Sequence, residues 1–197
     1  DSSLNAGAFI FFNTTSEKLN NATLRRAIRE GISVENLREV APETLPLNYP
    51  LLESQITLTK YPDIPAYNFE AAKEKIAALV GEEPPVLKIA TVNSGYLPVV
   101  TNVLASQLEM LGLKVDVSIS EEDQEFITNS GLNLANYRNM LGDDLLLGAR
   151  DTIDMTVRTK KYETFLEYWV NEVPAIALYR PNLTYYYNKN VSTFGNE

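Results

Sequence analysis

Residues 86–119 constrain the fold of this chain more than any other stretch, because they combine a strand, a turn, a helix and a second strand. The sequence there is VLKIATVNSGYLPVVTNVLASQLEMLGLKVDVSI. The apolar run over residues 86–92 predicts a strand, and Asn93-Ser94-Gly95 predicts the turn that ends it. Pro98 then suits the first turn of a helix, where its missing N–H would have no partner in any case.

The remainder of this stretch fits a helix followed by a strand. Apolar side chains recur at three- and four-residue spacing, as on one helix face; they are Val100, Val103, Leu104, Leu108 and Leu111. Gly112 stands where a left-handed C-terminal cap is expected. Apolar and polar residues alternate over residues 113–119, as in a half-buried strand. The unit predicts two parallel strands, 86–92 and 113–119, bridged by a helix near 98–111 with a right-handed crossover.

The charge balance argues against nucleic acid as a partner. The chain has 17 Lys and Arg against 26 Asp and Glu, a net charge of −9, whereas phosphate binding requires a basic patch. The one basic cluster, Arg25-Arg26-Arg29, has helical spacing, and we expect it to lie on a solvated helix face. No apolar run approaches the roughly 18 residues of a membrane span, so direct membrane insertion is not expected.

The absence of cysteine and histidine removes whole classes of chemistry. Disulfides, thiol nucleophiles, thiolate zinc sites and histidine-based triads are all excluded. The sequence also has no P-loop, no GxGxxG and no EF-hand loop, and we expect neither a cofactor nor a metal site. An enzyme of this composition would have to use carboxylates, Lys, Tyr, Ser or Thr.

The N-terminal part predicts a strand and then helices with recognisable caps. Residues 8–12 are a continuous apolar run, which is typical of a strand buried on both faces. Asn21 can cap a helix that ends near Gly31, and Ser33 can cap a second, short helix through Val40.

A proline-rich stretch separates these helices from the next one. Residues 41–65 contain five prolines and show no sustained helical period. Because a residue before proline avoids the helical conformation, we expect an extended excursion over the surface there. A helix is then predicted from about Asn68 to Val80, with Gly81 ending it.

The C-terminal part predicts further helices and strands. The acidic run Glu121-Glu122-Asp123 suits the start of a helix through Ile127, and Asn133 and Asp154 can cap two later helices. The inward stripe of the last helix is expected to comprise Val157, Tyr162, Phe165, Leu166, Trp169 and Val170. Strands are predicted at 175–179 and 183–187, with a turn at Arg180-Pro181-Asn182 between them.

The turn after the first central strand is the best-placed candidate for ligand binding. In open α/β sheets, ligands collect beyond the carboxyl ends of strands and at helix N-termini. Asn93, Ser94 and Tyr96 are expected there, with amide, hydroxyl and phenol groups. A plain strand-to-helix connection explains these residues equally well. Glu122 is a weaker candidate, since it follows the next strand and its charge also suits a helix N-terminus.

Four blocks of sequence follow one another in an order that is typical of one protein family. They read FIFFNTTSEKLNNATLRRAIREGIS, YNFEAAKEKIAAL, the central unit described above, and LNLANYRNMLGDDLLLGARDTIDMTVRTKKYETFLEYWVNEVPAIALYRP. In this order they resemble the C-terminal lobe of the family 5 extracellular solute-binding proteins, the dipeptide-, oligopeptide- and nickel-binding receptors of ABC importers. The blocks cover most of the chain.

The resemblance implies both a fold and a function. The fold is α/β, one lobe of a type II periplasmic-binding-protein fold, with a mixed sheet flanked by helices. Residues 1–197 would form a single domain with the Pro-rich excursion at 41–65. The implied function is binding of a peptide or similar small solute, without catalysis, as two lobes close around it. The implied partners are the missing N-terminal lobe and an ABC importer permease. The implied location is extracellular or periplasmic, with a lipoprotein anchor on the full-length protein.

The sequence departs from the family pattern in two places. The N-terminal half that supplies the other wall of the ligand cleft is absent, and residues 1–8 and 194–197 are expected where the backbone would cross to it. The family also has a longer segment before the block that starts at Leu132, with a strand and a ligand-facing loop. Residues 128–131 bridge that gap directly here.

The residues by themselves leave two other classes of function open. One is an enzyme subdomain that uses carboxylates, with Glu121 to Asp123 as acid and base. The other is a protein-interaction module that presents a Tyr185–Tyr187 strand at a sheet edge. The same tyrosines would also fit a strand packed against a sheet.

Overall fold

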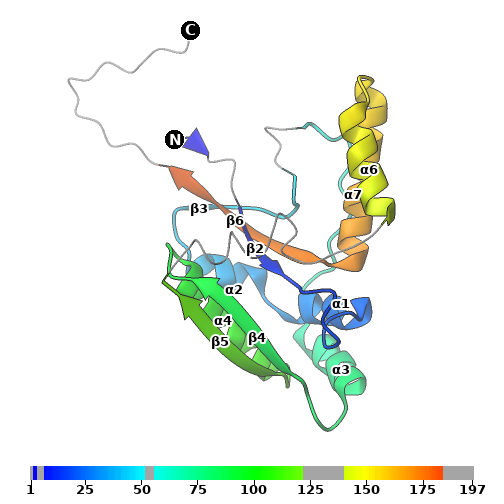
Figure 1. The fold of residues 1–197 in the computed structure, drawn as a ribbon. Helices are drawn as coiled ribbons and strands as arrows, with labels where there is room; N and C mark the ends of the chain where they lie inside the picture. The colour runs from blue at the N-terminus through cyan, green and yellow to red at the C-terminus, as the bar shows by residue number, and fades with distance from the viewer. Residues whose placement is uncertain (1, 4–6, 52–55, 122–139, 184–197) are drawn as a thin grey trace, which may run out of the picture.

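The chain forms an α/β structure, and the computed structural model describes residues 2–3, 7–51, 56–121 and 140–183 (Figure 1). The elements in chain order are β1 (Ser2–Ser3), β2 (Ala8–Phe11), α1 (Ala22–Gly31), α2 (Val34–Glu39), β3 (Thr44–Pro46), α3 (Phe69–Val80), β4 (Val86–Val92), α4 (Leu97–Met110), β5 (Lys114–Ser120), α6 (Met140–Asp151), α7 (Met155–Glu172) and β6 (Ala175–Leu183). Within the described ranges, every helix is too short or too polar to cross a lipid bilayer.

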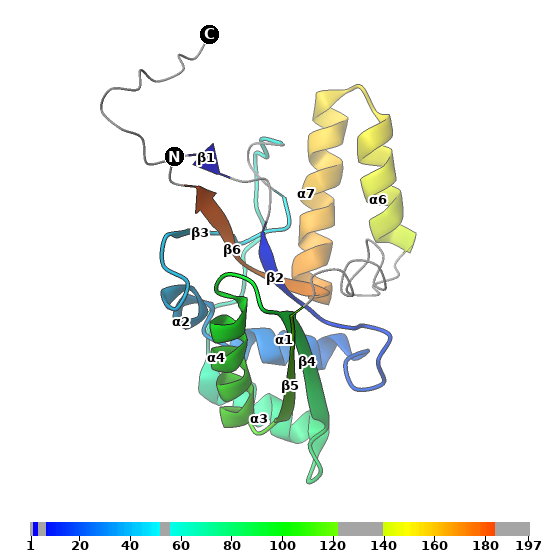
Figure 2. The same ribbon diagram turned by 60° about the vertical axis from the view of Figure 1, so that its left-hand side comes forward.

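The predicted central unit is confirmed. β4 and β5 pair in parallel, from Val86 opposite Lys114 to Val92 opposite Ser120. α4 bridges the two strands and packs against both of them (Figure 2). Pro98 lies in the first turn of α4, and Gly112 adopts a left-handed φ of +91° directly after the helix. After α4, the left-handed turn at Gly112 leads the chain into β5, which runs parallel to β4.

A second sheet is built around β6. β1, β2 and β3 all pair with β6, and all three pairings are antiparallel. The parallel and antiparallel pairs therefore belong to two separate sheets. Two predictions for these strands are wrong. β2 is not buried on both faces, since Phe11 is 43% exposed. There is also no turn at Arg180-Pro181-Asn182, because β6 continues through these residues to Leu183.

The pairing of β6 explains why a proline can stand inside it. Pro181 lies opposite Thr44 of β3. β2 pairs with β6 only as far as Tyr179, and β1 pairs with β6 only from Asn182 onward. Pro181 falls between these two stretches, and such a break in pairing is where a strand tolerates the missing N–H of proline.

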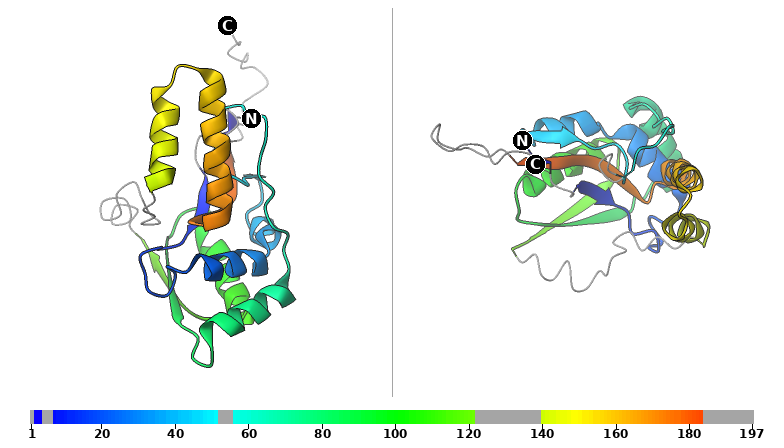
Figure 3. Two further views of the ribbon diagram at one scale, coloured as in Figure 1. Left: turned by 90° about the vertical axis from the view of Figure 1, so that its right-hand side faces the viewer. Right: turned by 90° about the horizontal axis from the view of Figure 1, so that it is seen from above.

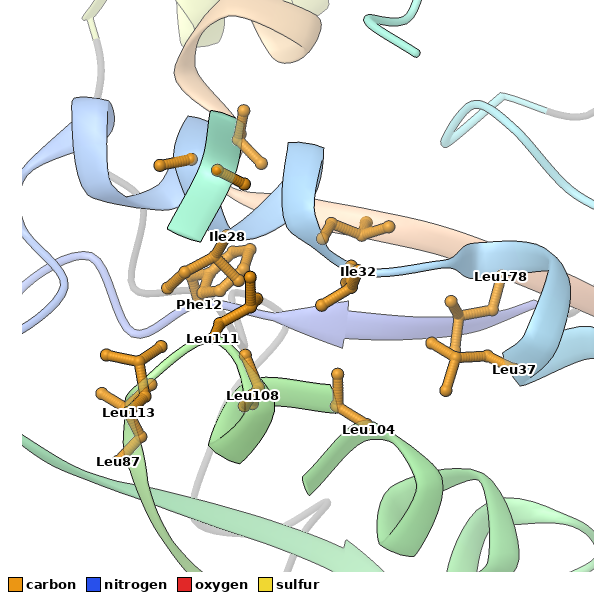
Figure 4. Packing of buried hydrophobic residues seen from close by; sticks show 14 of the residues in the cluster. Phe12, Ile28, Ile32, Leu37, Leu87, Leu104, Leu108, Leu111, Leu113 and Leu178 are labelled. Carbon is orange, nitrogen blue, oxygen red and sulfur yellow. The ribbon is translucent and has the colours of Figure 1, made fainter. Parts of the chain in front are cut away.

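The main core lies between the two sheets and the helices α1, α2 and α4. Phe12, Ile28 and Leu111 meet at its centre, and Leu37 packs near Leu178 at one end (Figure 4). Gly31 allows a close approach of three helices in this core. A Cβ on Gly31 would lie 2.7 Å from the Cβ of Ala72 in α3 and 2.7 Å from a methyl carbon of Leu111. Only a residue without a side chain fits between α1, α3 and the end of α4.

The arginines of α1 do not lie on a solvated face, and that prediction is wrong. Arg25 is only 2% exposed and Arg29 only 9%. The reason is the position of α1, which crosses the C-terminal end of α7 (Figure 3). The last carbonyl groups of a helix have no partner inside it and carry partial negative charge. The guanidinium groups of α1 are placed against those carbonyls.

Each arginine of the cluster reaches a different part of this helix end. Arg25 donates from Nη2 to the Glu172 carbonyl at 2.6 Å and from Nε to the Val173 carbonyl at 3.1 Å. Arg26 donates to the carbonyl of Asn171 at 3.0 Å, and Arg29 donates to the carbonyl of Val170. Arg25 also donates from Nη1 to two carbonyls just before α1; they belong to Leu19 and Asn20. The cluster therefore joins the N-terminal helix to the end of α7.

Replacing Arg25 by methionine should strongly destabilise the fold. Arg25→Met leaves the carbonyls of Glu172 and Val173 buried without their donor, and we expect a loss of about 3–5 kcal/mol in the free energy of unfolding. Arg26→Met is the matched control, since its bonds are exposed, and it should cost about 0.5–1.5 kcal/mol. Urea denaturation followed by circular dichroism measures both. Equal losses in the two variants would contradict the structural role of the buried guanidinium.

α7 is anchored at its start, middle and end. Asp154 caps it by accepting hydrogen bonds from the backbone N–H groups of Thr156 and Val157. Glu163 accepts bonds from the hydroxyl and N–H of Thr59 and from the N–H of Lys60. These bonds, with the Thr59 hydroxyl contributing most, lower the pKa of Glu163. They also hold part of the proline-rich excursion against the helix.

Only part of the predicted inward stripe of α7 is buried. Leu166, Trp169 and Val170 are buried, as predicted, but Val157 is 43% exposed. The reason is that α6 and α7 form a hairpin that projects from the sheets, with the first turns of α7 at its outer end (Figure 2). The helix expected at residues 121–127, the start of the helix expected at Asn133 and the tyrosines 185–187 lie outside the described residues.

Truncation of Trp169 tests the buried part of this stripe. Trp169 is 7% exposed and packs in a cluster with Leu47 and Ala177. Trp169→Ala should cost about 3–5 kcal/mol. Val157→Ala, on the same helix, should change stability by about 0.5 kcal/mol or less. Denaturant unfolding measured by circular dichroism separates the two cases. A loss below about 1 kcal/mol for Trp169→Ala would show that the stripe is not a core face.

Candidate functional site

The loop between β4 and α4 begins as an extension of the parallel strand pair. The N–H of Asn93 donates to the Ser120 carbonyl at 2.8 Å, one step beyond the last paired residues of β4 and β5. The side-chain amide of Asn93 donates to a carboxylate oxygen of Glu121 at 3.0 Å. Asn93 therefore ties the carboxyl ends of the two strands together.

The next three residues turn the chain into α4. The N–H of Ser94 donates to the carbonyl of Val92, and the N–H of Leu97 donates to the carbonyl of Ser94. Gly95 takes a left-handed φ of +53°, which glycine adopts without steric cost. Tyr96 is the N-terminal cap residue of α4, but its side chain makes no capping bond. Its phenol group is free to face the neighbouring sheet instead.

A hollow of about 360 Å³ lies between this loop and β6. Ser94 and Tyr96 line it from the loop, Tyr179 lines it from β6, and Thr44 lines it from β3. Figure 2 shows the connection from β4 to α4 lying beside β6. The hollow thus joins the two sheets at the carboxyl end of β4, where α/β proteins place their ligands.

Two phenol groups, those of Tyr96 and Tyr179, line the hollow. Tyr179 is only 4% exposed. Burial raises the pKa of Tyr179, and the nearby Tyr96 raises it further. Both phenols can donate or accept hydrogen bonds as neutral groups. Glu43, which has a positive φ of 63°, contributes a carboxylate to the rim.

The structure brings together two of the four residues predicted from the sequence. Ser94 and Tyr96 share the hollow. Asn93 bonds to Glu121 on the side of β5 and does not line it. Glu122 lies outside the described residues. Tyr179 and Thr44 were not predicted for the site, and only the position of Tyr179 at the end of an apolar strand could have suggested it.

The described side chains of the hollow can form hydrogen bonds with a ligand. No group of three or more acidic side chains in the described ranges is arranged to hold a metal ion. The hollow offers hydroxyls, phenols and backbone groups, which suit recognition of amide and carbonyl groups by hydrogen bonding. For the carboxylate-enzyme alternative, Glu121 is exposed and bonded to Asn93, while its two acidic neighbours lie outside the described residues.

Comparisons with known proteins identify the fold. No family profile matches the chain, and no curated protein sequence matches it. Solved structures do match. DppA of Helicobacter pylori, a periplasmic binding protein in complex with the peptide STSA, superposes with a TM-score of 0.76 at 19% identity, over 92% of this chain and 43% of that one. The oligopeptide-binding protein AppA of Bacillus subtilis, in complex with a nonapeptide, gives 0.71 at 21% identity, over 88% and 44%. NikZ of Campylobacter jejuni, in complex with Ni(L-His), gives 0.74 at 18% identity, over 87% and 44%.

This chain has the fold of one lobe of a periplasmic binding protein. It spans less than half the length of each of these structures. The resemblance drawn from the order of the sequence blocks is therefore confirmed at the level of the fold. The lobe carries its own core and both of its sheets within the described residues.

The raised pKa of Tyr179 predicts how the stability of the lobe changes at alkaline pH. The neutral phenol stabilises the folded state fully below the unfolded-state pKa of about 10. That contribution is lost as the pH rises through the higher folded-state pKa. The free energy of unfolding should therefore fall more steeply between about pH 9 and pH 11 in the unmodified lobe than in Tyr179→Phe. Tyr67→Phe, at a side chain that is 57% exposed, controls for the loss of one phenol. Parallel curves for the lobe and Tyr179→Phe would contradict the burial of this phenol.

Proposed function

We propose that the lobe binds a peptide or a similar small solute as one half of a two-lobe receptor for an ABC importer. The observation that carries this proposal is the hollow at Ser94, Tyr96 and Tyr179, at the end of β4 in a binding-protein lobe. Polar groups on a partly apolar wall suit a peptide, whose backbone needs hydrogen-bond partners and whose side chains need apolar contact.

The mechanism follows from having only one wall of a cleft. A ligand that rests on the hollow keeps its opposite face in water, so affinity must come from a second lobe that closes over it by a hinge motion. Ser94 and Tyr96 would position the ligand in the open state, because the turn that presents them is fixed by the bonds of Asn93. Closure would then remove water from these hydrogen bonds.

In the proposed receptor, the lobe would be one domain with protein partners and a defined location. Residues 1–197 would act as a single folding domain, with no catalytic step. The N-terminal lobe and the importer permease would be its protein partners. The full-length receptor would work outside the cytoplasmic membrane, held to it by a lipoprotein anchor.

The isolated lobe should bind peptides weakly or not at all. Calorimetric titration of the 197-residue chain with di- to pentapeptides should give dissociation constants of about 1 mM or weaker, since one wall buries too little of a ligand. Ser94→Ala and Tyr96→Ala should weaken any such binding by about three- to tenfold. Met110→Ala, at an exposed side chain away from the hollow, is the control. Micromolar binding by the lobe alone would overturn the one-wall mechanism, and weak binding that survives both variants would overturn the site.

The full-length gene product tests the function directly. It should contain a second lobe beside this segment and bind peptides at micromolar concentrations or below. A full-length product without a second lobe would overturn the proposed function even if the hollow binds ligand.

A further inference from the structure

A second and larger hollow, of about 440 Å³, is lined by no residue of the β4–α4 loop. Its walls come from α1, α2, α7, β6 and the proline-rich excursion, and none of its lining residues is shared with the candidate peptide site. Its size is within the range of sites for small molecules.

Arg29 is the unusual group in this hollow. Its side chain is 9% exposed, and one terminal nitrogen donates to the Val170 carbonyl. Its Nε is buried and has no hydrogen-bond partner among the described residues. No described carboxylate lies within ion-pair distance of it. Burial, and then the charge of Arg26, lower its pKa, and the charge of Glu30 offsets part of this lowering. A largely buried cation with no ion-pair partner among the described residues is costly, and an anion bound in the hollow that Arg29 lines would offset part of that cost.

Arg38 adds a second guanidinium to the same walls. It donates to the carbonyls of Leu178 and Leu47 and to the side chain of Asn48, which fix its position. Glu35 is the one carboxylate among the described lining residues, and it is exposed. The charged lining therefore has a positive excess in a chain whose net charge is −9. Guanidinium groups suit carboxylates in particular, because their donors match both oxygens.

The rest of the lining is apolar and aromatic. Trp169 and Ile176 line the hollow from α7 and β6, Ile64 lines it from the excursion, and Tyr67 lines it from just beyond the excursion. A ligand that contacted only the charged groups would leave these apolar surfaces exposed to water. The lining therefore favours an anion with an apolar or aromatic body.

We propose that this hollow is a binding site for a small organic carboxylate with an apolar or aromatic body, its carboxylate directed at Arg29. The site is separate from the peptide site, and neither proposal depends on the other.

The single tryptophan of the chain reports on this site directly, because Trp169 lines the hollow. Titration of the 197-residue chain with 3-phenylpropionate should change Trp169 fluorescence in a saturable way. The neutral 3-phenylpropionamide, of the same shape, should bind at least about tenfold more weakly, since it lacks the charge. Equal responses to the acid and the amide, or no saturable response to the acid, would overturn the proposal.

Variants separate the site from general effects on the fold. Arg29→Met should abolish the response, whereas Arg150→Met, at an exposed residue outside the lining, and Tyr96→Ala should leave it unchanged. Glu35→Gln removes an exposed carboxylate from the wall and should tighten binding of the acid about twofold or more, by relieving like-charge repulsion. Glu35→Gln tests the proposed site even if Arg29→Met does not fold. Binding that is unchanged in Glu35→Gln and is retained in folded Arg29→Met would show that the ligand lies elsewhere.

Discussion

The arrangement of this lobe depends on the contact between the arginines of α1 and the carbonyl end of α7. A helix end buried in a protein must find donors for its last carbonyls. Here the guanidinium groups of Arg25, Arg26 and Arg29 supply them. Because β6 begins within three residues of the end of α7, the same contact fixes where β6 enters the sheet. The Pro174 carbonyl then accepts a bond from the N–H of Phe12, and β2 is aligned beside β6.

The contact between α1 and α7 also affects the geometry of both hollows, because it positions β6. β6 carries Tyr179 toward the β4–α4 loop and Ile176 toward the second hollow. Arg29 donates to the helix end from Nη1, and its side chain also lines the second hollow. A single buried charge therefore has a structural role and the means to attract an anion. Such double use is possible because guanidinium has five donors in a rigid plane.

Local sequence signals predicted the local structure well. The caps at Asn21, Ser33 and Asp154 and the left-handed Gly112 all stand where their chemistry placed them. The parallel pairing of β4 and β5 followed from the length of the helix between them. The burial of Arg25 could not be predicted in this way, because helical spacing identifies a face but not what packs against it. The continuity of β6 through Pro181 depends on partners from distant parts of the sequence. For the same reason, the loop residues of the candidate site were found from the sequence, and Tyr179 was not.

The position of β6 has a consequence for how the chain is made. All three of its partners, β1, β2 and β3, precede it by most of the length of the protein, and Arg25 bonds to a carbonyl 147 residues later. During synthesis these early strands and the arginine cluster have no native partner until β6 emerges from the ribosome. The β4–α4–β5 unit, whose contacts are local, can form first. Assembly of the second sheet is thus a late and slow step, and the nascent N-terminal segment, with the apolar residues of β2 uncovered, is the part most in need of a chaperone.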